Sequence, residues 1–192
     1  MKNIITPVLL LMALLLASCA QSPQQLSLTL NEPPAQLPPG AAIVDLKGID
    51  ARGSNKVGSR GGVYAESSVI TTTPLFLQTL VDAYRQALLS SGRVTIQDGA
   101  PVAISVILED FSISTPKRSV LPEIVYSAKL SVKVLKGRQT RLYRYSADQK
   151  HTLATVPSDV KSQELTNELF SVVLSQAIAD DALNDFMMSA VN

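Results

Sequence analysis

Cysteine and histidine, the residue types that most often carry chemistry, each occur once in this chain, as Cys19 and His151. A single cysteine excludes an intrachain disulfide and a cysteine-rich zinc site, and a single histidine excludes the common multi-histidine metal sites. A hydrolase would need His151 beside a nucleophile and an orienting carboxylate, for which Ser162 and Asp159 are nearby in the sequence. Because the chain has no Gly-x-Ser-x-Gly pattern, we interpret His151 as an exposed residue at a strand end. We predict no catalytic residue, no metal and no cofactor.

Cys19 directly follows a short apolar segment near the start of the chain. Lys2 supplies one positive charge, and Ile4–Ala17 is nearly all apolar. This segment is shorter than the ~20 residues that a helix needs to span a bilayer. The pattern therefore predicts a secretory signal rather than a membrane-spanning anchor.

The residues Leu16-Ala17-Ser18-Cys19 resemble the bacterial lipobox at all four positions. The resemblance implies cleavage between Ser18 and Cys19 and attachment of acyl chains to Cys19, which would become the N-terminus. Three acyl chains would hold the protein on a membrane essentially permanently. Ala20, rather than Asp, implies delivery to the outer membrane. The alternative is a plain secretory signal with an incidental cysteine.

A glycine-rich segment, Arg52–Gly62, contains several basic residues. It lacks the Gly-x4-Gly-Lys-Ser/Thr spacing of a phosphate-binding loop, and it leads into a predicted strand rather than a helix. We interpret it as a mobile hairpin loop. The alternative is that Asp50, Arg52 and Arg60 form a polar contact site for a partner, because loops often carry binding residues.

Basic residues also gather on and around a predicted hairpin: Lys129, Lys133, Lys136, Arg138, Arg141, Arg144 and Lys150. They predict either a basic face for anionic lipid headgroups, glycan polymers or an acidic partner, or an ordinary solvated sheet face. In the second case the balancing acidic residues are those of the last helix, Glu164, Glu168, Asp180, Asp181 and Asp185. The three aspartates lack the alternate spacing and the glycine of a calcium loop. The chain as a whole has 17 Lys and Arg against 16 Asp and Glu, a balance that argues against a nucleic-acid partner.

The elements that position these residues begin after a proline-rich segment. Residues 19–40 predict a semi-rigid tether, because prolines favour extended geometry. Within it, Leu26, Leu28 and Leu30 alternate with polar residues, as in a short strand docked on a domain edge. The first strands of the domain are predicted at Ala42–Ile49 and Glu66–Thr72.

Two helices are predicted from periodicity and end signals. Pro74–Ser91 carries apolar residues on one face, with Thr73 as N-cap and Gly92 as the stop. The second helix follows Pro157, begins at Ser158 or Ser162 and is bent or interrupted at Asp180-Asp181.

Three further strands are predicted between the helices. Val102–Leu108 alternates, and Phe111 and Ile113 take the opposite parity, which predicts a bulge near Glu109-Asp110. Ile124–Leu135 and Leu142–Ala147 predict a hairpin, which His151–Thr155 extends or follows. The element order predicts an α+β fold: a two-layer domain with a mostly antiparallel sheet covered on one face by two helices.

Taken together, these features resemble the YajG-like family of small Gram-negative outer-membrane lipoproteins. The resemblance rests on the lipobox, the residues Asp50-Ala51-Arg52 and Val57-Gly58-Ser59-Arg60, the Leu77–Gly92 helix and the C-terminal run from Glu164 to Asp180. It implies a signal peptide (1–18), a lipidated Cys19 with its tether (19–40) and one periplasmic domain (41–192).

The function expected from this resemblance is non-enzymatic. The lipoprotein would be anchored in the outer membrane by its acyl chains, face the periplasm, and tether or bind another cell-envelope component, protein or glycan. One alternative is an accessory lipoprotein of an envelope transport or peptidoglycan-synthesis machine, by analogy of fold. A small envelope hydrolase is the alternative of a different class.

Overall fold

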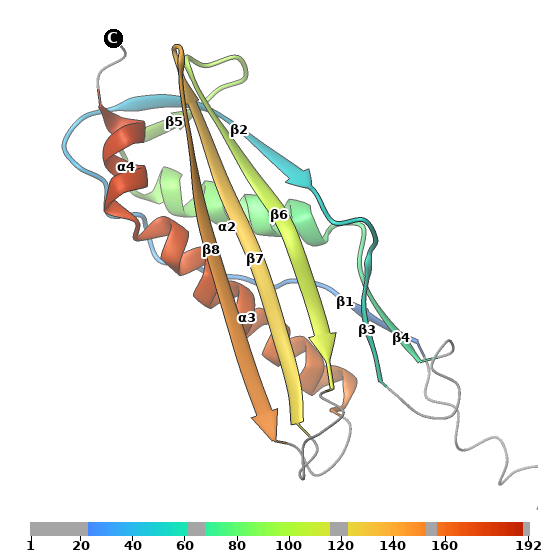
Figure 1. Cartoon of the computed structure of the whole chain (residues 1–192). Helices are drawn as coiled ribbons and strands as arrows, with labels where there is room; N and C mark the ends of the chain where they lie inside the picture. Colours follow the sequence, from blue (N-terminus) through green and yellow to red (C-terminus); the bar gives the residue numbers. More distant parts are fainter. Residues whose placement is uncertain (1–22, 61–67, 116–122, 153–156, 190–192) are drawn as a thin grey trace, which may run out of the picture.

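The alternating residues between 102 and 152 form the three longest strands of a curled sheet. The computed structural model describes residues 23–60, 68–115, 123–152 and 157–189. Strands β6 (Val102–Ser114), β7 (Glu123–Lys136) and β8 (Gln139–Thr152) lie side by side and pair antiparallel (Figure 1). The register between β6 and β7 shifts between Leu108 and Asp110, which confirms the predicted bulge.

Shorter strands extend the sheet on the other side of β6. β2 (Ala42–Asp50) runs parallel to the first half of β6, and β5 (Val94–Ile96) runs parallel to β2. Beside the far end of β6 lie β3 (Lys56–Ser59), β4 (Val69–Thr72) and β1 (Gln24–Leu26). The sheet is therefore mixed, and its longest ladders are antiparallel, as predicted.

The segment predicted as a mobile loop contains strand β3, so that prediction is wrong for Lys56–Ser59. Gly58 pairs with Ile113 of β6, and a Cβ atom on Gly58 would lie 2.5 Å from the Ile113 carbonyl oxygen. The glycine is needed for this close approach of two backbones, not for mobility. Gly61, Gly62 and the first residues of the predicted strand Glu66–Thr72 lie outside the described residues.

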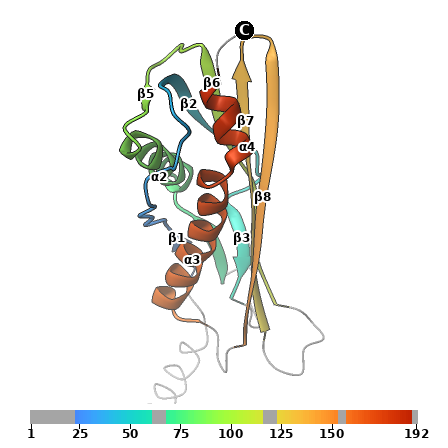
Figure 2. The same cartoon turned by 90° about the vertical axis from the view of Figure 1, so that its left-hand side faces the viewer.

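All helices of the described residues lie on one face of the sheet (Figure 2). They are α2 (Phe76–Ser90), α3 (Asp159–Ile178) and α4 (Asp181–Met188). Ser158 caps α3 and Gly92, with a φ of 69°, follows the end of α2, as predicted. The predicted N-cap Thr73 is wrong, because α2 begins two residues later, after Leu75, and lacks a side-chain cap.

The predicted interruption at Asp180-Asp181 separates α3 from α4. The Asp180 carboxylate accepts a hydrogen bond from the Leu183 backbone nitrogen at 3.1 Å, so it caps a new helix rather than continuing the old one. The same carboxylate accepts a hydrogen bond from the Tyr145 hydroxyl at 2.8 Å. Burial and this bond raise the pKa of the Tyr145 phenol, so it stays a donor that fixes α4 to β8.

Three phenylalanines join the two layers at the centre of the core. The rings of Phe76 (α2), Phe111 (β6) and Phe170 (α3) lie 5.0–5.6 Å apart between centroids. Edge-to-face and offset arrangements of this kind stabilise a core beyond the area that they bury. The core therefore holds both long helices against the middle of the sheet.

Most of the segment predicted as a tether packs on the domain. Leu26 is fully buried, and Leu28, Ala35 and Leu37 are at most 9% exposed. The backbone nitrogens of Ser27 and Thr29 donate to the side chains of Gln163 and Asn167 on α3, each at 3.0 Å. The predicted docking of this leucine pattern is confirmed, and residues 24–37 are not a free spacer.

Candidate functional site

One face of the sheet carries no helix in the described residues. In β2 the even-numbered residues point towards the helices and the odd-numbered residues point away from them. Residues that pair across neighbouring strands point to the same side of the sheet, so the register assigns each residue of β6, β7 and β8 to one side or the other. We call the opposite side the outer sheet face. Its central residues are Ile49 of β2, Ser105 and Ile107 of β6, Lys129, Ser131, Lys133 and Leu135 of β7, and Leu142, Arg144, Ser146, Asp148 and Lys150 of β8.

Large aliphatic side chains are exposed on this face. Ile43 and Ile49 of β2 are 47% and 45% exposed, and Leu135 and Leu142 are each 42% exposed. Exposed aliphatics gathered on one face, rather than scattered singly, are typical of a contact surface. These aliphatic residues were not predicted as contact residues, although their parity along each strand indicates that they point outwards.

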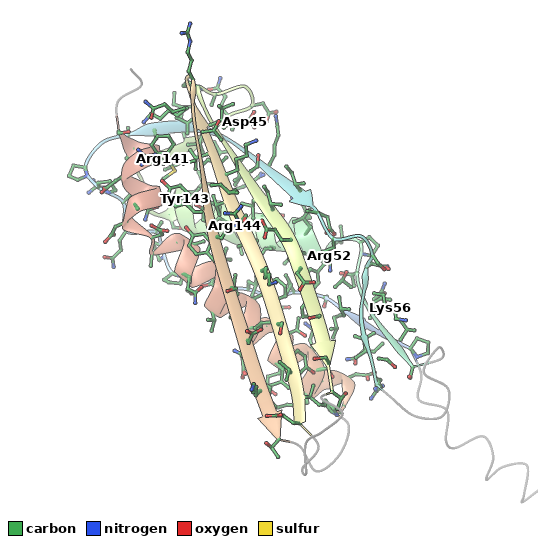
Figure 3. The ribbon with its side chains drawn as sticks, in the orientation of Figure 1. Asp45, Arg52, Lys56, Arg141, Tyr143 and Arg144 are labelled. Atoms are coloured by element: carbon green, nitrogen blue, oxygen red, sulfur yellow. The ribbon has the colours of Figure 1, made fainter. Side chains whose placement is uncertain are left out.

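The cations of the hairpin concentrate towards its turn. Between Lys129 and Arg144 the chain has six basic residues and no acidic one. We call five exposed residues of this part the cationic patch: Lys133, Leu135, Arg138, Leu142 and Arg144. Figure 3 shows Arg144 on β8 in the middle of the sheet. Among the described residues no ion pair involves these three cations, so their charges are available to a partner.

Two predicted members of the basic cluster face the helices instead. Lys136 is 6% exposed, and its Nζ donates to the carbonyl oxygens of Phe186 and Met187 at 3.0 and 3.3 Å and to the carbonyl oxygen of Ser189. The Arg141 guanidinium lies 4.2 Å from the Phe186 ring centroid. Both cations therefore hold the C-terminal end of α4 on the hairpin.

On β2, the exposed Lys47 is neutralised within the fold. Its Nζ lies 2.9 Å from the Asp45 carboxylate, which also accepts the Gly99 backbone nitrogen at 3.1 Å. The hydrogen bond from Lys47 has the larger effect and lowers the pKa of Asp45, and the hydrogen bond from Gly99 lowers it further. This pair orders the loop after β5 and leaves little net charge on β2.

The predicted contact residues Asp50 and Arg52 bind one another. Arg52 is a bidentate donor to the Asp50 carboxylate, at 2.9 and 2.7 Å, and its side chain is 7% exposed. The guanidinium also contacts the Thr72 hydroxyl at 3.2 Å and lies 5.6 Å from the Phe76 ring centroid. The hydrogen bond from Arg52 lowers the pKa of Asp50. Arg52 joins the end of β2 to β4 and the core.

Arg60, the third predicted contact residue, has other partners. Its guanidinium pairs with Asp159 at 2.8 Å and donates to the Pro157 carbonyl oxygen at 3.2 Å. It thus ties the end of β3 to the start of α3. A partner contact at Asp50, Arg52 and Arg60 stays a prediction, and each residue already has a place in the fold.

His151 is half-buried rather than exposed. Its ring packs edge-on against Tyr126 at 5.9 Å, and its Nε2 has no hydrogen-bond partner within the described residues. The two groups considered for a hydrolase are placed otherwise, because Asp159 pairs with Arg60 and Ser162 is buried in α3. This geometry gives the hydrolase alternative no support.

Two open grooves border α3 on the helix side. One lies between residues 29–31, Gln149 and α3, and the other lies between the proline pair Pro33-Pro34 and the end of α3. In the described part of the chain, no three His, Cys, Asp or Glu side chains are placed to hold a metal ion. The described helices are also too short or too polar to cross a membrane.

A family model described as uncharacterized lipoprotein matches residues 31–188. The chain belongs to this lipoprotein family. The match confirms the predicted resemblance to YajG-like lipoproteins and makes this a bacterial envelope lipoprotein. No curated protein matches the chain.

Solved structures of other bacterial proteins are similar to this lipoprotein. A protein of Xanthomonas campestris is 13% identical, with 82% of this chain and 93% of that chain covered and a TM-score of 0.54. The rare lipoprotein B of Shewanella oneidensis is 14% identical, with 71% and 87% covered and a TM-score of 0.44. A minor lipoprotein of Acinetobacter baumannii is 12% identical, with 79% and 93% covered and a TM-score of 0.41. The first of these likenesses shows a shared fold.

The predicted processing site of the lipoprotein, Ser18 and Cys19, lies outside the described residues and before the family match. Cleavage and acylation there stay predictions. The described fold begins its first strand at Gln24, so only four residues separate Cys19 from the folded domain.

Proposed function

We propose that this lipoprotein is anchored in the outer membrane through acyl chains on Cys19, faces the periplasm, and binds an anionic component of the envelope through its outer sheet face. It acts without catalysis. The observation that carries the proposal is the cationic patch, in which Lys133 and Arg144 lie beside exposed leucines on the outer sheet face and Arg138 lies in the adjoining turn. Within the described residues these three cations form no ion pair.

The placement of the patch supports this role. Gln24 pairs with Ile70, and the adjacent Gly58 pairs with Ile113, so the chain enters the fold at the Ser114 end of β6. The hairpin turn is at the other end, beside Val102. Eleven residue-to-residue steps along β6 separate Val102 from Ile113, a distance of about 36 Å. Anchoring at one end therefore presents the patch away from the membrane surface.

Confinement to a membrane layer is the physical basis of the tethering. A domain that is held in a thin layer meets partners in that layer at a raised effective concentration, so a patch of modest affinity suffices. Charge on the patch would speed the encounter with an anionic partner.

The proposal is tested by crosslinking in intact cells. A photoreactive amino acid replaces Lys133 in the full chain, and a matched variant carries it at the exposed Gln86 of α2. We expect one discrete adduct at position 133 and none at 86. Equal labelling at the two positions, or none, contradicts binding through the outer sheet face. Mass analysis of the mature N-terminus tests the acyl chains, and Cys19→Ser must release the protein from membranes.

A further inference from the structure

We infer that the cationic patch binds the helix surface of a second copy of this chain, so that copies associate side by side in the plane of the membrane. The inference rests on the proposed function, which supplies the anchor and the binding face, and it names the occupant of that face. It starts from the distribution of charge between the two layers.

The β7–β8 hairpin and the two C-terminal helices carry opposite net charge. Residues 123–152, which form the hairpin of β7 and β8, have seven basic and two acidic side chains, a net charge of +5. Residues 159–188, which form α3 and α4, have one basic and six acidic side chains, a net charge of −5. Within the described residues no ion pair joins this hairpin to α3 or α4, and Asp159 of α3 pairs instead with Arg60, which follows β3. The exposed charges of the hairpin are therefore not neutralised by ion pairs to these two helices of the same copy.

The helix layer has an exposed side that matches the patch in character. We call Glu168, Val172, Asp181 and Asp185 the anionic helix surface; all four are exposed, and Val172 is an exposed aliphatic at 43%. Exposed aliphatics thus accompany cations on the outer sheet face and anions on the helices. Such complementary pairs favour contact and specify the partner face.

The heights of the two surfaces along the sheet also match. The hydroxyls of Tyr145 and Tyr143 bind Asp180 and the Ala182 carbonyl oxygen, and Arg141 lies over Phe186. These contacts place α4 beside residues 141–145 of β8. Arg144 and Leu142 belong to the same stretch on the outer side, and Lys133 is directly opposite Leu142. Two copies that stand in the same direction therefore bring Asp181 and Asp185 level with Arg144 and Lys133.

The anchor requires that neighbouring copies stand in the same direction. Four residues between Cys19 and Gln24 allow a span of at most about 18 Å. An antiparallel pairing of two β8 edges would place the anchored ends at opposite ends of a sheet about 36 Å long. Both anchors would then not reach one leaflet with the strands upright. The sheet-to-helix contact keeps all anchors at one end, and it is heterologous, so it builds rows or rings.

The inference is tested with two tagged full-length chains that are co-expressed and processed in cells. One carries Arg144→Cys and the other Asp181→Cys; the one native cysteine, Cys19, is consumed by lipidation in the proposed function. We expect a disulfide between the two tags on mild oxidation. Chains that carry Arg144→Cys alone, or Asp181→Cys alone, are the matched controls and should remain uncrosslinked. Crosslinking of Arg144→Cys with itself would indicate a face-to-face dimer and overturn the inference.

Charge reversal gives a second readout that does not depend on cysteines. Lys133→Glu with Arg144→Glu in both tagged copies should lower their co-purification about tenfold or more, because like charges then face one another at every contact. Adding Asp181→Lys with Asp185→Lys to one of the two copies should restore it. Unchanged thermal unfolding of each exposed double variant shows that the loss is not unfolding. Loss without restoration contradicts the pairing of these two surfaces.

The outcomes separate this inference from the proposed function. If Lys133 crosslinks to a different envelope molecule and the two tags never join, the occupant is foreign and the self-association is wrong, while the proposed function stands. If position 133 crosslinks to nothing, both the proposed function and the self-association are wrong.

Discussion

At the scale of single residues, Gly58 is a position at which a side chain would collide with the backbone of a neighbouring strand. β3 crosses the end of β6 so closely that an added Cβ would contact the Ile113 carbonyl oxygen at 2.5 Å. We expect Gly58→Ala to lower the free energy of unfolding by about 1–3 kcal/mol, because the backbones must separate. Gly53→Ala is the matched control, since nothing lies within 4 Å of its Cβ position. Chemical denaturation of the detergent-solubilised protein measures both variants, and equal stability would contradict the close crossing.

The Asp50–Arg52 pair makes stability depend on acid pH. Arg52 lowers the pKa of Asp50 below its ordinary value of 3.8. The unfolded chain therefore takes up the proton first as the pH falls, so the stabilisation is complete above 3.8 and is lost as the pH falls through the lower, folded value. We expect Asp50→Asn to lower the free energy of unfolding by about 1 kcal/mol near pH 7, since solvent screens this partly exposed carboxylate.

The difference between the wild type and Asp50→Asn should shrink as the pH falls below about 4, because the Asp50 carboxyl of the unfolded chain then progressively takes up a proton and becomes neutral, as asparagine is. Denaturation at a series of pH values between about 3 and 7 measures it. A difference that stays constant down to pH 3 would show that Asp50 acts through shape rather than charge.

At the scale of elements, Lys136 connects the hairpin to the end of α4. Its ammonium group donates to carbonyl oxygens in the last turn of α4, where a helix leaves carbonyl oxygens without backbone donors. We expect Lys136→Met to cost about 2 kcal/mol of unfolding free energy, because the side-chain volume is kept but the hydrogen bonds are lost. Lys133→Met, in the same strand but on the outer sheet face, should change stability by less than about 0.5 kcal/mol. If Lys136→Met leaves the free energy of unfolding unchanged, the cost of burying the ammonium group is as large as the stabilisation from its hydrogen bonds.

The elements also show which parts of the fold could be predicted from the sequence. The bulge in β6 and the hairpin were predictable, because apolar parity is visible within each strand and changes at Glu109-Asp110. β5 was not, because three residues carry no periodicity and their pairing with β2 depends on where α2 returns the chain. β3 was hidden because its glycine serves a backbone contact with Ile113, 55 residues further along the chain.

The candidate site was predictable only in part. The basic residues of the hairpin were identified, but their division between two faces was not. Lys136 shares the parity of Val132 and Val134, which are buried, so its inward orientation followed from the same pattern that predicted the strand. The acidic surface of α3 and α4 was expected to balance the hairpin within one copy. Among the described residues no ion pair joins the hairpin to α3 or α4, and this depends on tertiary placement, which a single sequence does not specify.

At the scale of the whole molecule, the separation of charge makes salt affect association and folding differently. The exposed charges of the outer sheet face and those of the helices lie on opposite sides of one copy (Figure 2), and ions screen interactions over about 8–10 Å at moderate ionic strength. Exposed charges of the sheet and helices therefore contribute little to folding. Contacts between the cationic patch and a neighbour's helix surface would be shorter and more sensitive to salt.

Raising the salt concentration from about 0.05 to about 0.5 M should therefore dissociate copies of the solubilised lipoprotein and leave the fold intact. We expect the sedimentation profile to shift towards the monomer, while the free energy of unfolding changes by less than about 1 kcal/mol, because the core depends on buried apolar contacts such as the three phenylalanine rings. Lys133→Glu with Arg144→Glu should be monomeric already at low salt, which assigns the effect to the cationic patch. If the association survives high salt, aliphatic contacts through Leu135 and Leu142 hold the copies together instead, and Leu142→Ser should then dissociate them where salt does not.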